Sequence, residues 1–442
     1  MSNEKNEGTR LNVCLLNDSF PPVIDGVANT VLNYATILQK KYGNSFVVTP
    51  EYKGAVDNYP FQVYRYASSG ITKSWGYRAG VPFSPSAYEE IAQDRIDIIH
   101  CHCPMVSAMV ARTIRELTGA PMIMTYHTKF DIEIRKALKL EMLAKVGIRT
   151  LVENMEAADE VWVVSDGAGK NLRGMGYQGR LRVMENGVDF PRGRVTPAAV
   201  AELKGKHAIP ADVPVFLFVG RMNWYKGVRI SLDALRMLRQ NGQDFRMILV
   251  GDGLDASEIR QYTKEIGIDD RCIFTGAIRD RELLRAYFCT ANLFLFPSTY
   301  DTNGIVVREA AACGLGSVLI RGSCAAEGIA DGQNGILIAE NAESMYRALQ
   351  SVCRKPEVMS AIGQHAMDEI YISWEDAVDH AYQRYLQIYE WAKGKNLHRS
   401  FTPQDEMWKA VAQMYRQSRK VYEISHRKPS LSRKTVHKKL KK

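Results

Sequence analysis

Short apolar stretches alternate with longer amphipathic ones along most of the chain. The apolar stretches are rich in Val, Ile, Leu and Phe, which is typical of strands that are buried on both faces. This alternation of strands and helices predicts parallel sheets covered by helices on both sides. The pattern predicts strands at 11–16, 45–48, 62–64, 96–100, 121–125, 160–164, 181–184, 213–219, 246–250, 272–275, 293–296, 317–320 and 335–338.

The length of 442 residues predicts two domains with a large core. We expect an α/β fold made of two doubly wound, Rossmann-like units, residues 1–190 and residues 191–372. A helix over 373–395 follows, and then a basic tail over 396–442. Doubly wound units bind ligands at the carboxyl ends of their strands. The active cleft should therefore lie between the two units.

The positive charge is concentrated at the C-terminus. Residues 397–442 contain 13 Lys or Arg and 3 Asp or Glu, whereas the whole chain has a net charge of +9, so the rest is close to neutral. Such a segment is either a solvated extension or a site of attraction to anionic lipid, which amounts to about 1 kcal/mol per basic residue near a membrane surface. Nucleic acid is not an expected partner, because no reading motif is present.

No apolar run reaches the ~18 residues that a membrane span requires. The polar N-terminus, MSNEKNEGTR, lacks an apolar signal region. We therefore expect a cytoplasmic protein, with peripheral attachment to the inner face of the plasma membrane if its basic segments bind lipid. The eight cysteines are scattered, which indicates reduced, buried thiols. The run from His100 to Cys103 has no second pair at zinc spacing, so we interpret it as structural or cleft-lining and expect no metal.

Two carboxylates lie across a predicted strand-to-helix junction in FPSTYDTNGIVVREAAACGLG. Asp301 follows the strand at 293–296, and Glu309 lies on the helix opened by Asn303 and Gly304. The N-terminus of a helix offers free N–H groups and the positive end of the helix dipole, and both favour an anion. Carboxylates beside it can accept hydrogen bonds from sugar hydroxyls. This combination fits a nucleotide sugar.

Two cations follow the strand at 213–219. Arg221 comes directly after it, and Lys226 is expected to begin the next helix. A guanidinium offers forked donors to phosphate oxygens and an ammonium adds a compact charge, so we favour diphosphate binding over a solvated turn. His127 lies just past the strand at 121–125, where strand ends point into the cleft.

Taken together, these motifs resemble the signature of the retaining GT-B glycosyltransferases of family 4 (glycosyl transferases group 1). That family shows Glu-x7-Glu where this chain has Asp301-x7-Glu309. The resemblance extends to Phe20-Pro21-Pro22 with Asp25-Gly26-Val27, Thr125–Thr128, Asn186–Asp189, Gly220-Arg221 with Lys226-Gly227, Gly251–Gly253, Gly276 and Trp374. It covers roughly residues 11 to 392 and implies that the final helix crosses back to brace the first domain. The implied activity is transfer of a hexose from a UDP- or GDP-sugar to an acceptor hydroxyl.

The resemblance also implies residue roles. Arg221 and Lys226 should bind the diphosphate without a divalent metal or another cofactor. Glu309 should accept hydrogen bonds from the donor ribose, and Asp301 should contact the transferred sugar. The N–H groups of Asn303, Gly304 and Ile305 should hold sugar and phosphate, His127 should lie near the acceptor and the reacting carbon, and Gly26 should let the backbone pass close to the donor. Asp25 and the shorter Asp301 depart from the family pattern.

Two features favour a lipid acceptor. Residues 131–152 can form an amphipathic helix on which Arg135, Lys139 and Arg149 fall within an arc of ~80° at 100° per residue. Trp75, Tyr77 and Arg78 form a basic, aromatic loop suited to a membrane interface. The alternative for the helix is core packing with a solvated face. Diacylglycerol glucosyltransferases of the family have similar features, so we expect a glycolipid acceptor such as diacylglycerol.

Other functions remain open at this point. The acceptor could be a soluble or polyprenyl-linked saccharide. A GT-B nucleotide-sugar 2-epimerase is a second kind of enzyme, which Asp301-x7-Glu309 speaks against. A non-enzymatic partner that lost turnover is favoured only by Asp25 and Asp301. The intact family residues argue for an active site: His127, Arg221, Lys226 and Glu309. Fold resemblance alone identifies neither sugar nor acceptor.

Overall fold

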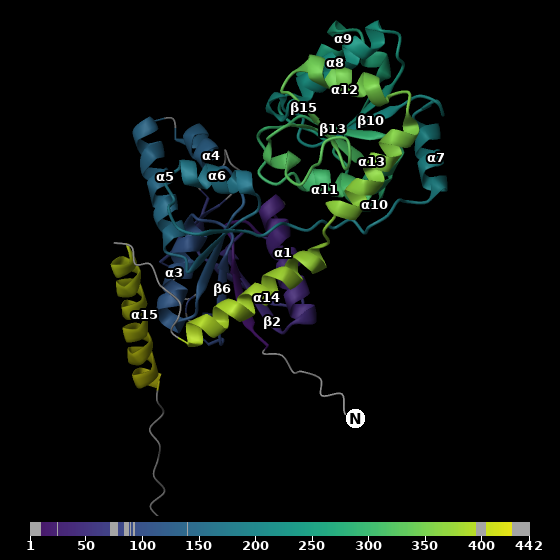
Figure 1. Cartoon of the computed structure of the whole chain (residues 1–442). Helices are drawn as coiled ribbons and strands as arrows, with labels where there is room; N and C mark the ends of the chain where they lie inside the picture. Colours follow the sequence, from purple (N-terminus) through teal and green to yellow (C-terminus); the bar gives the residue numbers. More distant parts are fainter. Residues whose placement is uncertain are drawn as a thin grey trace, which may run out of the picture.

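The computed structural model of the chain describes residues 10–23, 25–70, 78–83, 88, 90–91, 93–138, 140–394 and 404–426. Two separate parallel sheets with flanking helices are arranged one after the other in the sequence (Figure 1). Each sheet has a hydrophobic core of its own. A third cluster of buried residues lies between the first sheet and α14 (Trp374–Lys393). The prediction of two Rossmann-like units is confirmed, and the strand positions agree with the sequence pattern to within two residues.

The first sheet has seven parallel strands in the order β3-β2-β1-β6-β7-β8-β9. Its strands are β1 (Asn12–Leu16), β2 (Asn44–Pro50), β3 (Gln62–Tyr66), β6 (Ile98–Cys101), β7 (Met122–Tyr126), β8 (Glu160–Val163) and β9 (Leu181–Val183). Its helices are α1 (Gly26–Lys41), α3 (Val106–Thr118), α4 (Phe130–Ala137), α5 (Glu141–Glu156) and α6 (Asp166–Gly174). The sequence pattern missed a short antiparallel pair, β4 (Ser68–Ser69) and β5 (Ala79–Gly80), because two-residue strands carry no periodicity.

The second sheet has six parallel strands in the order β12-β11-β10-β13-β14-β15. Its strands are β10 (Val215–Val219), β11 (Arg246–Val250), β12 (Cys272–Gly276), β13 (Leu293–Phe296), β14 (Gly316–Ile320) and β15 (Ile336–Ile338). Its helices are α7 (Pro197–Lys206), α8 (Val228–Gln240), α9 (Ala256–Glu265), α10 (Arg281–Thr290), α11 (Ile305–Ala312), α12 (Ala342–Val352) and α13 (Pro356–Glu369). Short 3₁₀ turns are η1 (Trp224–Lys226), η2 (Asp269–Arg271) and η3 (Cys324–Ala326).

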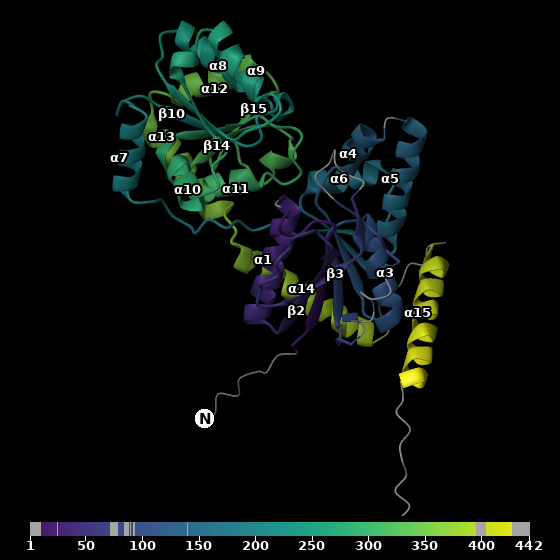
Figure 2. The same cartoon turned by 180° about the vertical axis from the view of Figure 1, so that it is seen from behind.

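Helix α14 (Trp374–Lys393) returns from the second unit to the first and lies against α1 (Figures 1 and 2). A capping box starts it, because the Ser373 and Asp376 side chains each bond the other's backbone N–H. Its apolar face buries Trp374 and Tyr385 in the core of the first unit. The buried Arg384 guanidinium also pairs with Glu160 on β8. The helix thus attaches the second unit to the first.

The basic tail is not wholly a solvated extension, which corrects one of the two sequence interpretations. Helix α15 (Asp405–His426) packs along α3 (Figures 1 and 2) and buries Trp408. Asp405 is 1% exposed and lies 2.8 Å from Nη2 of Arg112 and 3.0 Å from Nη2 of Arg115. A buried carboxylate shared by two buried guanidinium groups holds the start of α15 in place.

The single helix predicted over 131–152 is wrong. The structure has two helices, α4 and α5, and Leu138 between them has an extended backbone. The sequence pattern remains amphipathic across this junction, because apolar residues also occur between the two helices. A turn that contains no Gly or Pro gives no local signal in the sequence.

Candidate active site between the two domains

The carboxyl ends of β10 and β13 meet at one edge of the second sheet, since the two strands pair in parallel. The turn after β10 carries Lys226 as the last residue of η1, and α8 begins at Val228, two residues later than the sequence predicted. Gly227 between them has φ +77°, and a Cβ there would lie 1.9 Å from the carbonyl oxygen of Pro297. Glycine is therefore required to pack the Lys226 turn against the end of β13.

Lys226 and Asp301 form an ion pair at this edge, with Nζ 2.7 Å from Oδ1. The other carboxylate oxygen of Asp301 accepts a hydrogen bond of 2.6 Å from Oγ of Ser298. Lys226 is only 7% exposed, and its Nζ lies within 6 Å of the ring centroids of Tyr225, Phe296 and Tyr300. The site therefore holds one largely desolvated cation whose position is defined from several sides.

Helix α11 begins directly after this loop. Gly304 has φ +59° and caps the helix from the left-handed region, so the N–H groups that follow, starting at Ile305, are at the open end of the helix dipole. The side-chain amide nitrogen of Asn303 is buried and has no hydrogen-bond partner among the described residues. Arg221 is exposed, and its guanidinium forms no ion pair with a described residue. Among the described residues, the Asn303 amide and the first N–H groups of α11 thus lie at this helix end without a protein acceptor.

Glu309 lies one turn further along α11, and only 12% of its side chain is exposed. Nη2 of Arg281, at the start of α10, donates to Oε1 of Glu309 at 2.6 Å. Burial raises the pKa of Glu309 above its usual value, whereas the Arg281 charge lowers it and the Asp189 charge raises it. The resemblance-based role of Glu309 needs a carboxylate that stays ionised, and Arg281 supplies the compensating charge.

His127 is the candidate site residue that the first domain contributes, and it directly follows β7. It is 6% exposed, and its Nε2 lies 3.0 Å from Nδ1 of His102. His100 continues the series, with Nε2 2.7 Å from Oγ1 of Thr125. Burial lowers the pKa of His127 to about 3 and that of His100 and His102 well below the usual value. These imidazoles are neutral at physiological pH, so His127 can position groups by hydrogen bonding but carries no positive charge.

The loop before α11 touches the first domain directly. Oγ1 of Thr302 donates to the carbonyl oxygen of His127 at 2.6 Å, and Oγ of Ser165 donates to the carbonyl oxygen of Thr302 at 2.5 Å. The carboxylate of Glu327 accepts the Asp166 and Gly167 N–H groups at 2.7 and 2.6 Å, across the domain boundary at the start of α6. These contacts place Thr302, the residue after Asp301, against the backbone of His127 from the other domain.

Gly26 begins α1, and a Cβ built on it would meet no described atom within 4 Å. Protein atoms therefore leave space in front of this residue. The neighbouring Asp25 caps α1, since its Oδ1 accepts the N–H groups of Val27 and Ala28 at 2.8 Å each. This carboxylate occupies the helix terminus that an anion would otherwise take, which gives the departure from the family pattern a structural use.

The residues predicted to contact an acceptor or a membrane do not form one group in the described part of the structure. Trp75, Tyr77 and Lys139 lie outside the described residues. The Arg78 guanidinium is half-buried and donates to Oγ and the carbonyl oxygen of Ser68, so it ties β5 to β4. Arg135 and Arg149 lie on α4 and α5 and pair with Glu141 and Glu153.

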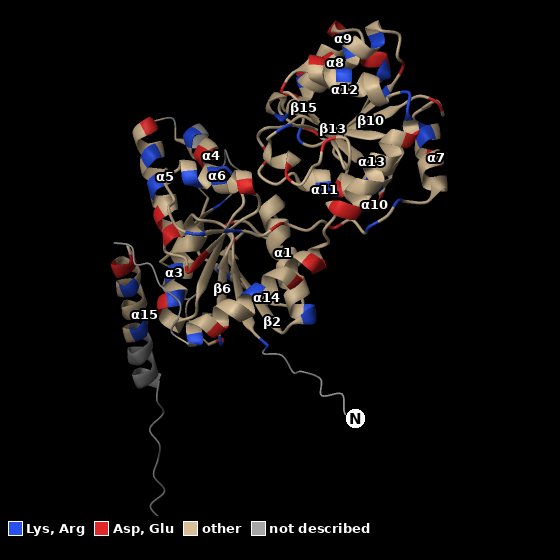
Figure 3. Cartoon of the chain, in the orientation of Figure 1, with Lys and Arg blue, Asp and Glu red and all other residues tan. Residues whose placement is uncertain are grey.

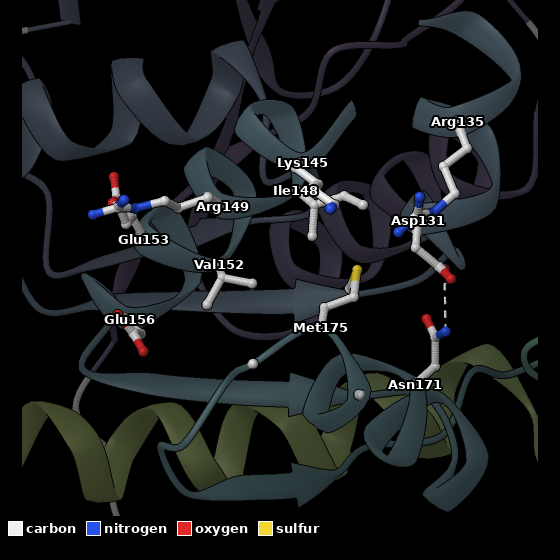
Figure 4. A pocket seen from close by; sticks show the side chains of 12 residues that line it. Asp131, Arg135, Lys145, Ile148, Arg149, Val152, Glu153, Glu156, Asn171 and Met175 are labelled. Carbon is white, nitrogen blue, oxygen red and sulfur yellow. Dashed lines mark hydrogen bonds and ion pairs between the residues drawn. The ribbon is translucent and has the colours of Figure 1, made fainter. Parts of the chain in front are cut away.

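Both arginines line an open cavity of about 680 Å³ between α4, α5 and α6. Figure 4 shows Arg135, Lys145 and Arg149 around it together with Asp131, Glu153 and Glu156. Its walls come from the first domain alone, so it is separate from the Lys226 and Asp301 site. Among the described residues, no group of three or more His, Cys, Asp or Glu is arranged to hold a metal ion.

Sequence reasoning missed three residues of the site: Arg281, Ser298 and His102. Arg281 follows a strand end and a helix-capping residue, Asp280, so its place at the cleft edge could have been inferred. Ser298 lies in the signature stretch, but nothing in the sequence indicates that its hydroxyl bonds Asp301. His102 was interpreted as part of a structural or cleft-lining run, but its contact with His127 could not be predicted, because that contact depends on the packing of β6 against β7.

Comparisons with known proteins agree with this geometry. Residues 24–192 match the family described as Glycosyltransferase Family 4, and residues 200–368 match Glycosyl transferases group 1. Among solved structures, the Anabaena protein HepE in complex with UDP and glucose aligns with a TM-score of 0.66 and 19% identity over 85% of this chain and 99% of that one. Sucrose-phosphate synthase from Thermosynechococcus elongatus aligns with a TM-score of 0.70 and 21% identity over 86% and 100%.

Several proteins with similar sequences are named as glycosyltransferases or glycolipid synthases. Sulfoquinovosyl transferase SQD2 of Arabidopsis thaliana is 26% identical over 78% of this chain and 67% of its own length. Alpha-monoglucosyldiacylglycerol synthase of Streptococcus pneumoniae is 23% identical over 69% of this chain and 70% of its own. D-inositol 3-phosphate glycosyltransferase 2 of Catenulispora acidiphila is 28% identical over 62% and 66%. The chain therefore belongs to the family 4 glycosyltransferases with the GT-B fold, enzymes that transfer a sugar from a nucleotide sugar to an acceptor.

Proposed function

We propose that this glycosyltransferase moves a hexose from a UDP-sugar to a glycolipid acceptor such as diacylglycerol, with retention at the reacting carbon and without a metal. The donor part rests on the cations at the cleft. Lys226 and Arg221 would bind the diphosphate, and the N-terminus of α11 with the Asn303 amide would hold the sugar and phosphate oxygens. These groups supply the charge with which a metal ion would otherwise stabilise the leaving UDP. Structural neighbours in complex with UDP favour UDP over GDP.

The acceptor would approach from the first domain, past His127. In the proposed same-face reaction, the departing phosphate takes the proton of the acceptor hydroxyl as the new glycosidic bond forms and the bond to UDP breaks. His127 would orient the sugar as a neutral imidazole, because its pKa is lowered to about 3. Asp301 would contact a hydroxyl of the transferred sugar from its position beside Lys226.

A ridge of exposed apolar side chains on the first domain carries the lipid part of the proposal. Met142 is 75% exposed and Val146 is 59% exposed, one turn apart on α5, while Ala144 and Leu151 on the other side of the helix are buried. The ridge consists of Leu138, Leu140, Met142, Leu143 and Val146. Lys and Arg residues lie along α4 and α5 together with Asp and Glu residues (Figure 3). Exposed apolar groups with basic side chains among the surrounding charges suit the interface of a membrane.

Two other observations bear on this part of the proposal. The monoglucosyldiacylglycerol synthase among the relatives acts, by its name, on a diacylglycerol lipid. No helix in the described part of the chain is long and apolar enough to cross a membrane. Attachment through the ridge would therefore be peripheral. The D-inositol 3-phosphate glycosyltransferases among the relatives define the competing acceptor class, a small soluble polyol phosphate.

The test is a screen of UDP-hexoses with the purified protein, with UDP release measured with and without anionic vesicles that contain diacylglycerol. We expect vesicles to increase UDP release from one donor and a glycolipid to form. The paired substitutions Met142→Glu and Val146→Glu should abolish the increase but leave slow donor hydrolysis unchanged. Val56→Glu is the matched control, since Val56 is 82% exposed and follows β2, on the side of the sheet away from β8 and α5. UDP release that vesicles do not affect would contradict the lipid acceptor.

A further inference from the structure

Helix α10 carries two arginines, one turn apart, that reach the linker between the domains. Nη2 of Arg285 donates to the carbonyl oxygen of Gly193 at 2.9 Å. Nη2 of Arg281 lies 3.6 Å from Oδ2 of Asp189, and its guanidinium lies 4.3 Å from the ring centroid of Phe190. Both arginines therefore contact the linker, at positions 193 and 189–190. Only Arg281 also bonds Glu309.

The contact between Arg281 and Glu309 uses one oxygen of the carboxylate. Arg281 donates to Oε1 at 2.6 Å, and no described residue donates to Oε2. A carboxylate oxygen can accept about two hydrogen bonds. Oε2 is thus available to a ligand while Oε1 is held in place. The fixed geometry limits the rotation of the Glu309 side chain, and the Arg281 charge offsets the cost of burying it.

We propose that Arg281 is a positioning residue for the nucleotide, which holds Oε1 of Glu309 so that Oε2 accepts the ribose hydroxyls, and which ties this carboxylate to the interdomain linker. The proposal rests on the proposed function, in which Glu309 binds the donor ribose. Arg281 itself acts through Glu309 and not on the sugar or the phosphates.

The contact of Arg281 with the linker is followed by a contact of the linker with the first domain. Nδ2 of Asn33, on α1, donates to Oδ1 of Asp189 at 3.3 Å, while Oδ2 of Asp189 faces Arg281. The four side chains form a series from α1 to α11: Asn33, Asp189, Arg281 and Glu309. A shift of the domains relative to each other would move Asp189 and with it the restraint on Glu309. Nucleotide binding and the arrangement of the domains in this structure should therefore favour each other.

The first experiment measures UDP affinity by calorimetry for the wild type, Arg281→Ala, Glu309→Gln and the double variant. Loss of a charge-assisted hydrogen bond predicts an affinity about tenfold lower for Arg281→Ala. Because Arg281 acts through Glu309, the double variant should bind no more weakly than Glu309→Gln alone. Arg281→Lys keeps the charge and should recover part of the loss. Arg285→Ala is the matched control, because it removes a linker contact from the same helix and leaves Glu309 untouched.

A second probe isolates the ribose. UDP that lacks the 2′- and 3′-hydroxyls should bind the wild type and Arg281→Ala with the same affinity, because its ribose offers Glu309 nothing. A general weakening of the fold would lower the affinity for both nucleotides. Thermal unfolding of each variant checks that it is folded.

The pH dependence gives an independent readout. The charged and titratable groups that face Glu309 are Arg281 on α10, Asp189 in the linker and Cys313 at the end of α11. Without Arg281 the pKa of Glu309 should rise further, so more of it is protonated at lower pH. The affinity of Arg281→Ala relative to wild type should therefore be lower at pH 6 than at pH 8.

Two results would overturn the proposal in distinguishable ways. If Glu309→Gln weakens UDP binding and Arg281→Ala does not, Arg281 has no positioning role and the donor site stands. If Glu309→Gln leaves UDP binding unchanged, the ribose assignment itself fails, and with it both this inference and that part of the proposed function.

Discussion

The Nζ of Lys226 lies 2.7 Å from Oδ1 of Asp301, although the two residues are 75 positions apart in the chain. One comes from the turn after β10 and the other from the loop after β13. The pair lies in a largely buried place, and Ser298 holds the second oxygen of Asp301. The cation proposed to bind the diphosphate and the carboxylate proposed to contact the hexose thus lie side by side.

Lys226→Ala should lower kcat/KM for the donor by at least about 100-fold, because it removes the one buried cation that would stabilise the leaving diphosphate. The protein should remain folded, with Asp301 still bonded by Ser298. Initial rates of UDP release over a range of donor concentrations, and thermal unfolding, measure the two effects. The exposed Lys264→Ala serves as the control for loss of a lysine in the same domain. Near-normal turnover in Lys226→Ala would remove the diphosphate assignment.

Asp301→Glu should change donor selectivity. The short Asp301 side chain reaches both Lys226 at 2.7 Å and Ser298 at 2.6 Å, so an added methylene must move the carboxylate or break one of these contacts. The ratio of kcat/KM between UDP-glucose and UDP-galactose should shift by about tenfold, the scale of one methylene in a fitted site. An unchanged ratio, together with normal folding, would show that Asp301 does not contact the sugar.

Acid should destabilise the first domain through its buried histidines. Burial lowers the pKa of His127 from its usual 6.5 to about 3, so the unfolded chain binds a proton between these values that the native state does not. Stability from this group is therefore complete above pH 6.5 and falls as the pH decreases, by up to ~1.4 kcal/mol per pH unit. His127→Gln should make the decline of unfolding free energy between pH 7 and pH 5 shallower. Urea titrations at several pH values measure the unfolding free energy. The same decline of this free energy with pH in both proteins would contradict a neutral His127.

Removal of residues 427–442 should weaken binding to anionic vesicles. This segment contains eight Lys or Arg and no Asp or Glu. At about 1 kcal/mol for each basic residue near the surface, the affinity should fall by at least about tenfold in low salt, and the difference should shrink as salt rises. Vesicle co-sedimentation measures it, with uncharged lipid as the control. Equal affinity of both proteins would exclude a role of the segment in lipid binding.

A longer truncation would not test the same hypothesis. A cut at residue 397 also removes Asp405, which neutralises the buried Arg112 and Arg115. Leaving a buried charge without its partner costs about 3–5 kcal/mol, so loss of vesicle binding could then result from unfolding. Only a cut after α15 separates the charge of the tail from the stability of the first domain.

The sequence by itself determined the architecture and most of the candidate residues. Val-, Ile- and Leu-rich strands alternating with helices imply parallel sheets, because only strands covered on both faces are apolar throughout. Candidate roles for Arg221, Lys226 and Asp301 could be predicted because each residue follows a strand end, and a role for Glu309 because it lies on the helix that comes after one; these positions are local properties of the chain.

The tertiary structure decided which of these groups meet. Nothing near Lys226 in the sequence indicates a bond to Asp301, and nothing near Glu309 indicates Arg281, since both contacts depend on how neighbouring strands align. The break between α4 and α5 and the packing of α15 on α3 were likewise outside the reach of periodicity, because a helical pattern records which side of a helix is apolar and not what covers it. Local patterns follow from neighbouring residues, whereas pairing follows from the packing of the whole domain.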